Sequence, residues 1–272
     1  MAVSHVWVPE AARFGRDPET GVVIEQLTGE PVTSTNIYCE QRYASADGSR
    51  IAIVRRPFGR PAELWVCDLR SLRLCRVGEG EPVGANAPRQ AVYFIAAGGT
   101  PRLMRLDLAD LAVRELFAFE AGPAPRSVAV SPDERWALAG PFPAGDRVFR
   151  LCRVDLAGGR AEPFCEQEDM FNPHLQFEPG AGRLCAVQVN RGYRRRPETG
   201  ALALSGPLGA ALGVAEVAAG AFRLLPAGRP HTPGISGHEC WAGGSGVLLF
   251  TAGQYQVSAS AHVTLRDPPE AE

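Results

Sequence analysis

The stretches VAVSPDERWALAG (residues 128–140) and FRLCRVDLAGGRAEPF (residues 149–164) decide the fold class of this chain. In the first stretch, an apolar run is followed by the turn residues Ser-Pro-Asp and then by a second apolar run. In the second stretch, an apolar run ends in Asp-Leu, a glycine turn follows, and the chain returns through another strand-like segment. Short runs bounded by such turn residues are typical of β-strands. Together the two stretches predict four consecutive strands.

Both halves of this pattern recur along the chain, in YASADGSRIAIV (43–54), ELWVCDLRSLRLCRV (63–77), RLMRLDLADLAVRELF (102–117), LQFEPGAGRLCAV (175–187) and CWAGGSGVLLFT (240–251). Four strands in about 40 residues is the period of a β-propeller blade. A lone blade cannot bury both of its faces, so blades stack around an axis. A Greek-key sandwich has similar strand spacing, but the recurrent turn between paired strands favours the propeller.

We therefore predict an all-β propeller of about five four-stranded blades in a single domain, residues 1–272. Residues 1–37 form a lead-in, and the blades lie at about 38–77, 84–119, 125–166, 172–226 and 237–272. If only five blades are present, the ring must close or the chain must associate with itself through its open edge strands.

The composition indicates a globular protein and excludes several kinds of site. With 45% hydrophobic and 21% charged residues, the chain of 272 residues can bury a sizeable core. Its net charge of -2 gives no broad electrostatic reason to bind nucleic acid or an anionic membrane. Every basic residue is an arginine, which excludes lysine Schiff-base chemistry and the P-loop.

The cysteines and the apolar segments indicate in which cellular compartment the protein is expected. The 7 cysteines are scattered without a CxxC pair, as expected of buried thiols in strands. The longest apolar stretch, residues 200–222, contains Pro207 and Glu216 and is a poor membrane span. The N-terminal residues contain no secretory leader, so we expect a cytoplasmic protein without membrane segments.

Residues 188–212 interrupt the predicted fourth blade with an arginine cluster around Tyr193 and a Gly- and Ala-rich segment. Long loops on a rigid scaffold often carry function. A solvated loop explains the cluster equally well, and a nucleic-acid site would need more interleaved aromatic residues.

The segment LCRVDLAGGRAEPFCEQEDMFNPHLQFEPGAGRLCAVQVNRG (151–192), followed by ISGHECWAGGSGVLLFT (235–251), resembles the oligogalacturonate lyases. In that family an xHPxF-type strand precedes a THEFW-type strand, and the resemblance covers roughly residues 14–251 in matching order. It implies a seven-bladed, TolB-like propeller that cleaves short pectin fragments by β-elimination with manganese on the axis. The cation neutralises the carboxylate beside C5, and a neutral histidine then removes the C5 proton.

The resemblance assigns roles to individual residues. It places the catalytic base at His238, with Glu239 and Trp241 at the next matching positions. It implies substrate contacts at His174, and at Asn36 and Tyr38 in the entry strand. A basic pair that flanks this entry strand in the family is replaced here by Ser34 and Thr35.

This chain also departs from the family. The family's catalytic arginine falls near Leu212, so that Arg191 or the arginines at 194–196 would have to replace its contact with the substrate. The family's metal ligands lie in the last two blades, which would fall beyond residue 272, and only His262 could stand in for one of them. One histidine does not make a manganese site, which needs several ligands.

Two functions follow from these observations. The first is a lyase that acts on small anionic oligosaccharides, with His238 as base. The second is a non-catalytic TolB-like propeller that binds a sugar or a protein. A serine or cysteine hydrolase lacks support, because the chain has no GxSxG motif and no group that would orient Cys240 and His238.

His238 also has a purely structural interpretation. A histidine at a strand entrance beside glycine is commonly held by a hydrogen bond to a loop carbonyl.

Overall fold

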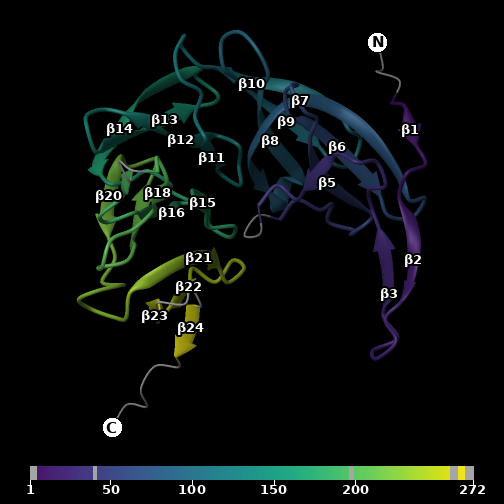
Figure 1. Ribbon diagram of the computed structural model, residues 1–272. Coiled ribbons are helices and arrows are strands. Elements are labelled where there is room, and N and C mark those ends of the chain that lie inside the picture. The colour runs from purple at the N-terminus through teal and green to yellow at the C-terminus, as the bar shows by residue number, and fades with distance from the viewer. Residues whose placement is uncertain (1–4, 39–41, 196–198, 258–262, 267–272) are drawn as a thin grey trace. The chain divides into compact units, whose positions relative to one another are not determined.

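The computed structural model describes residues 5–38, 42–195, 199–257 and 263–266 (Figure 1). These residues form β-strands and one short 3-10 helix, η1 (Ala87–Arg89), without any α-helix. They include no helix with the length and apolar character needed to cross a membrane. The predicted all-β class is confirmed. Contacts divide the chain into two compact units, residues 1–124 and 125–272, which are described separately.

The first unit contains a continuous antiparallel path of seven strands with a small hairpin beside it. The path runs β4-β5-β6-β7-β8-β9-β10, β1 pairs with β7, and β2 pairs with β3. The strands are β1 (Trp7–Val8), β2 (Ala12–Arg16), β3 (Val23–Gln26), β4 (Thr33–Thr35), β5 (Arg50–Arg56), β6 (Glu63–Asp68), β7 (Arg73–Asn86), β8 (Ala91–Ala96), β9 (Arg102–Asp107) and β10 (Val113–Ala118).

Strand β7 belongs to two blade-like sheets at once. Its first half pairs with β6, and its second half pairs with β8 from Gly80 to Asn86. The strand therefore runs through residues 78–83, which the sequence predicted as a gap between blades. At the crossing, a Cβ on Gly80 would lie 2.0 Å from the carbonyl oxygen of Ile95, so only glycine fits there.

The lead-in also takes part in the first sheet. Strand β1 pairs with β7 through Trp7 and Cys75, on the outer side of the predicted first blade. The inner strand begins at β4, earlier than the predicted residue 38, and continues at Tyr43, whose carbonyl accepts from the Ala52 amide at 2.9 Å.

The second unit contains two four-stranded antiparallel sheets, β11-β12-β13-β14 and β15-β16-β19-β20, and three two-stranded pairs (Figure 1). These sheets follow the segments predicted as the third and fourth blades. The strands are β11 (Ser127–Val130), β12 (Trp136–Pro143), β13 (Val148–Asp155), β14 (Arg160–Glu168), β15 (Gln176–Phe177), β16 (Leu184–Val189), β17 (Arg194–Arg195), β18 (Leu202–Ala203), β19 (Ala211–Glu216), β20 (Ala221–Leu224), β21 (Ile235–Trp241), β22 (Leu248–Ala252), β23 (Gln254–Val257) and β24 (Val263–Arg266).

The two four-stranded sheets of the second unit share one hydrophobic core. Leu138 and Leu151 from one sheet pack in the same cluster as Val187 and Ala215 from the other. Strand β16 is buried at every position after Leu184, so it is covered on both faces. Burying a leucine side chain contributes about 2 kcal/mol, which is the reason that neighbouring blades stack.

Side chains close the turns on which the sequence prediction rests. In the turn after β11, Asp133 Oδ1 accepts from the Ser131 hydroxyl at 2.5 Å, and Ser131 Oγ accepts from the Trp136 amide at 3.0 Å. The turn after Ser45 repeats this arrangement, with Asp47 Oδ1 accepting from Ser45 Oγ at 2.7 Å. The repeated turn is a structural unit as well as a sequence pattern.

Candidate functional site

A buried polar cluster lies in the second unit where the fourth-blade sheet meets β21. His174 lies just before β15, Gln176 lies in β15, Gln188 in β16 and Glu239 in β21. The Glu239 side chain is completely buried, with 0% exposure. Polar groups inside a protein cost free energy unless they are hydrogen-bonded, so the bonds of this cluster explain how it persists.

The centre of the cluster is a chain of three side chains. Glu239 Oε1 lies 3.0 Å from His174 Nδ1, and the other ring nitrogen, Nε2, lies 2.7 Å from Asn172 Nδ2. A carboxylate accepts hydrogen bonds and an amide nitrogen donates them. In this arrangement His174 Nδ1 donates to Glu239 and Nε2 accepts from Asn172. Both ring nitrogens are engaged, which suits a positioning group better than a base.

Further hydrogen bonds fix β21 against β15. Gln176 Nε2 donates to the Glu239 carbonyl at 2.8 Å, and Trp241 Nε1 donates to the Gln176 carbonyl at 2.9 Å. Gln188 Nε2 donates to the Asn172 carbonyl at 3.3 Å. Two buried acceptors, Gln188 Oε1 and Glu239 Oε2, have no hydrogen-bond donor among the described residues.

His238 lies on the exposed side of β21, between the buried residues Gly237 and Glu239. Its backbone has a φ of 59°, and the pairing of β21 with β22 shifts register between Gly237 and Cys240. A left-handed conformation costs a non-glycine residue about 1 kcal/mol, and such strain concentrates at functional sites. His174 has the same unusual conformation, with a φ of 46°.

Gly237 allows the strand to approach the cluster closely. A Cβ at this position would lie 3.4 Å from Gln188 Oε1 and 4.0 Å from His174 Cε1. The glycine therefore brings the backbone that carries His238 next to the His174 ring. The motif residues His174, His238, Glu239 and Trp241 lie together in the structure.

Arg191 is a predicted substrate contact, but its guanidinium is bonded to the backbone. It donates to the carbonyls of four residues, at distances between 2.7 and 3.2 Å: Leu208, Gly209, Ala210 and Arg229. These bonds use four of its five N–H groups. Burial lowers the pKa of this guanidinium from its ordinary value. The arrangement indicates a structural role, in which Arg191 holds the loop before β19.

The other predicted site residues are in other segments of the chain. Asn36 and Tyr38 follow β4 in the first unit, where Asn36 is exposed and Tyr38 is half-buried. Their contribution to a site with His238 stays a prediction. His262 lies outside the described residues. Leu212, where the family has its arginine, is fully buried in β19.

The described residues do not fit a manganese site. Among them, no three histidine, cysteine, aspartate or glutamate side chains gather closely enough to hold a metal ion. His174 and Glu239 bond to each other, and a divalent cation needs more ligands than this pair supplies.

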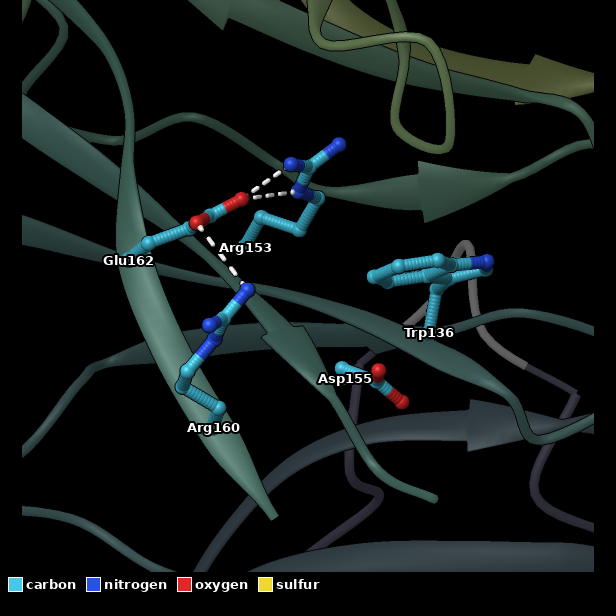
Figure 2. A pocket seen from close by; sticks show the side chains of 5 residues that line it. All are labelled: Trp136, Arg153, Asp155, Arg160 and Glu162. Carbon is cyan, nitrogen blue, oxygen red and sulfur yellow. Dashed lines mark hydrogen bonds and ion pairs between the residues drawn. The ribbon is translucent and has the colours of Figure 1, made fainter. Parts of the chain in front are cut away.

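A small pocket in this unit is lined by residues that form ion pairs with one another. Figure 2 shows Trp136, Arg153, Asp155, Arg160 and Glu162 around it. Arg153 Nε donates to Glu162 at 2.9 Å, and its guanidinium carbon lies 5.2 Å from the centre of the Trp136 ring. Arg153 lowers the pKa of the Glu162 carboxyl. These contacts connect strands β13 and β14 of the third blade, and they use the charged groups that line the pocket.

Comparisons with known proteins give the same fold. An oligogalacturonate lyase in complex with manganese matches 87% of this chain and 76% of its own, at 18% identity and a TM-score of 0.50. An oligogalacturonate lyase from Vibrio parahaemolyticus matches 96% of this chain and 85% of its own, at 11% identity and a TM-score of 0.51. TolB from Acinetobacter baumannii matches 77% of this chain and 46% of its own, at 18% identity and a TM-score of 0.50.

These similarities confirm the predicted β-propeller class and the resemblance to oligogalacturonate lyases and TolB-like proteins. No protein-family model matches the sequence, and neither does any curated protein. At these identities the likeness concerns the fold, since one fold hosts many activities.

The sequence reasoning missed three members of the cluster, namely Asn172, Gln176 and Gln188. A signal for two of them was present, because Gln176 and Gln188 interrupt the apolar runs LQF and AVQV. A polar residue within a buried strand needs a partner, and the partner of Gln176 lies on another strand.

Proposed function

We propose that this protein is a lyase of the oligogalacturonate type that cleaves short acidic oligosaccharides by β-elimination. The observation that carries the proposal is the setting of His238. Its side chain is exposed, its backbone lies in the left-handed region, and the next residue, Glu239, is the buried end of the hydrogen-bonded chain Glu239, His174 and Asn172. A hydrogen-bonded network next to an exposed imidazole suits a group that must meet a substrate atom in a fixed position.

In the proposed reaction, the imidazole of His238 takes the proton from C5 of a galacturonate unit. The electrons of that C–H bond form the C4–C5 double bond, and the glycosidic C4–O bond breaks. The leaving oxygen keeps the bonding pair and takes a proton from a solvent water molecule, while the His238 imidazolium later releases its proton to solvent. Glu239 orients His174, and the bonds from Gln176 and Trp241 hold the strand that carries His238. No step is assigned to a metal, because the described residues do not form its ligand set.

The similarity to two oligogalacturonate lyase structures over most of their length supports this choice among propeller functions. A second candidate, a propeller that binds acidic sugars without cleaving them, is favoured by a different observation. The buried Leu212 stands where the family places a catalytic arginine.

The test is an assay for the unsaturated product. Trigalacturonate is incubated with the protein, with and without added manganese, and ultraviolet absorbance is followed. We expect product formation, and a decrease of at least about 100-fold in His238→Asn. Asparagine tolerates the left-handed backbone conformation, so this variant removes the base while keeping the strand. His231→Asn is the matched control, because His231 is exposed in the loop before β21.

Calorimetric titration with the same sugar separates the two candidates. Binding without product, unchanged in His238→Asn, would establish the sugar-binding propeller in place of the lyase. If the wild-type protein shows neither binding nor product, both proposals are wrong.

A further inference from the structure

Four chain segments meet at one end of the sheets of the second unit, and Asp169 connects three of them. Its carboxylate accepts from Arg147 Nε at 2.9 Å, in the β12–β13 connection, and from the Gly192 amide at 2.6 Å, in the β16–β19 connection. Arg126, just before β11, donates from Nη2 to the Phe171 carbonyl at 3.2 Å. The loop that contains Asp169 and Phe171 leads to Asn172 and His174, so this end of the unit adjoins the candidate site.

Three stacked groups form a platform in this region. The Arg126 guanidinium carbon lies 4.2 Å from the centre of the Phe171 ring. The Phe171 ring stacks on Tyr193, with centroids 4.3 Å apart and planes 12° from parallel. Phe149, from the core of the third-blade sheet, packs edge-on against Phe171 at 5.7 Å. The cation is therefore held on an aromatic support that is anchored in the core.

Arg126 differs from the neighbouring arginines in what it binds. Arg147 forms a two-nitrogen pair with Asp169, and the guanidinium of Arg191 is taken up by backbone carbonyls. Arg229 is exposed, but within the described part of the chain no aromatic ring supports it. Arg126 is exposed, and the described residues provide its guanidinium with one carbonyl hydrogen bond and no carboxylate.

We propose that Arg126, held on Phe171, binds the carboxylate of a uronate unit while a neighbouring part of the sugar reaches His238. A guanidinium matches a carboxylate with two parallel hydrogen bonds, and its stacking on Phe171 reduces the entropy lost on binding. The inference rests on the proposed function and adds to it the group that recognises the acidic character of the substrate.

The experiment compares two probes, trigalacturonate and its methyl ester, by calorimetric titration. The ester has the same sugar rings but lacks the negative charges. We expect the wild-type protein to prefer the acid. In Arg126→Gln, affinity for trigalacturonate should decrease about tenfold while affinity for the ester stays the same. Arg126→Lys keeps the charge without the planar fork and should give an intermediate loss.

The matched control is Arg160→Gln. Arg160 has an 81% exposed side chain and lies at the start of β14, whereas Phe171 follows the end of the same strand. This variant should bind both probes like the wild-type protein. If the wild-type protein binds the acid and Arg126→Gln keeps the full preference, the inference is wrong while the proposed function stands. If the wild-type protein binds neither probe, the proposed function is overturned and the inference with it.

Discussion

Glu239 is a buried carboxylate with a hydrogen-bond donor at only one of its two oxygens. Oε1 contacts His174 Nδ1 at 3.0 Å, whereas Oε2 has no donor among the described residues. Two effects oppose each other here. The buried charge is costly, but its removal leaves the His174 N–H without an acceptor, which costs about 1 to 3 kcal/mol.

This opposition predicts different outcomes for two substitutions. Glu239→Gln keeps an acceptor oxygen for His174 and removes the charge, so the free energy of unfolding should change by less than about 1 kcal/mol. Glu239→Ala removes the acceptor and leaves a cavity, so the loss should be about 3 kcal/mol. Urea titration of both variants measures the difference. Equal losses would show that His174 does not depend on the hydrogen bond to Glu239.

Single residues also show what the sequence could reveal about the site. The resemblance of NPHLQF and GHECW to two motifs of the oligogalacturonate lyases singled out His174, His238, Glu239 and Trp241. The contact between His174 and Glu239 joins residues 65 positions apart, so no local spacing could predict it. For Arg191, its charge indicated a ligand contact, but the carbonyls that bind it come from the folded loop.

At the scale of elements, local turn chemistry was easier to predict than strand continuity. The turns at Asp47 and Asp133 follow from short-range hydrogen bonds, which their own residues encode. The passage of β7 through residues 78–83 was missed because Gly78 and Gly80 resemble loop residues. Their role is to let the strand approach its neighbour, since a Cβ on Gly78 would lie 3.0 Å from the Phe94 ring.

The turn at Asp133 gives a prediction for an element. Asp133→Ala removes the acceptor for the Ser131 hydroxyl and the Arg135 amide, which should lower the free energy of unfolding by about 1 kcal/mol. Asp146→Ala is the control, because Asp146 is exposed in the next turn of the same sheet, and its effect should stay within about 0.5 kcal/mol. Urea unfolding followed by circular dichroism gives the midpoints of the two variants and of the wild-type protein. A control as destabilised as Asp133→Ala would contradict this role.

At the scale of the whole molecule, several carboxyl groups have a lowered pKa in the folded state, and each of them makes the stability depend on pH in the same sense. Side-chain hydrogen bonds lower the pKa of Asp47 and of Asp133, and Arg153 lowers that of Glu162. A hydrogen bond from the Ser71 backbone amide lowers the pKa of Asp68. A carboxyl group with a lower pKa in the folded state stabilises that state above its unfolded pKa of about 4. This stabilisation is lost as the pH falls from the unfolded pKa through the folded pKa, because the carboxyl group is then protonated in the folded state as well as in the unfolded state.

The free energy of unfolding should therefore be nearly constant from neutral pH down to about pH 5 and decrease progressively below about pH 4. The double variant Asp47→Asn/Asp133→Asn tests the cause. It should be less stable than the wild-type protein at pH 7, and the difference should shrink at acid pH, because protonated wild-type carboxyls no longer contribute. Urea midpoints measured from pH 7 to about pH 2 give the stability of the wild-type protein and of the double variant as a function of pH. Parallel curves, or a wild-type stability that does not fall with acid, would show that these turn carboxylates do not govern the acid response.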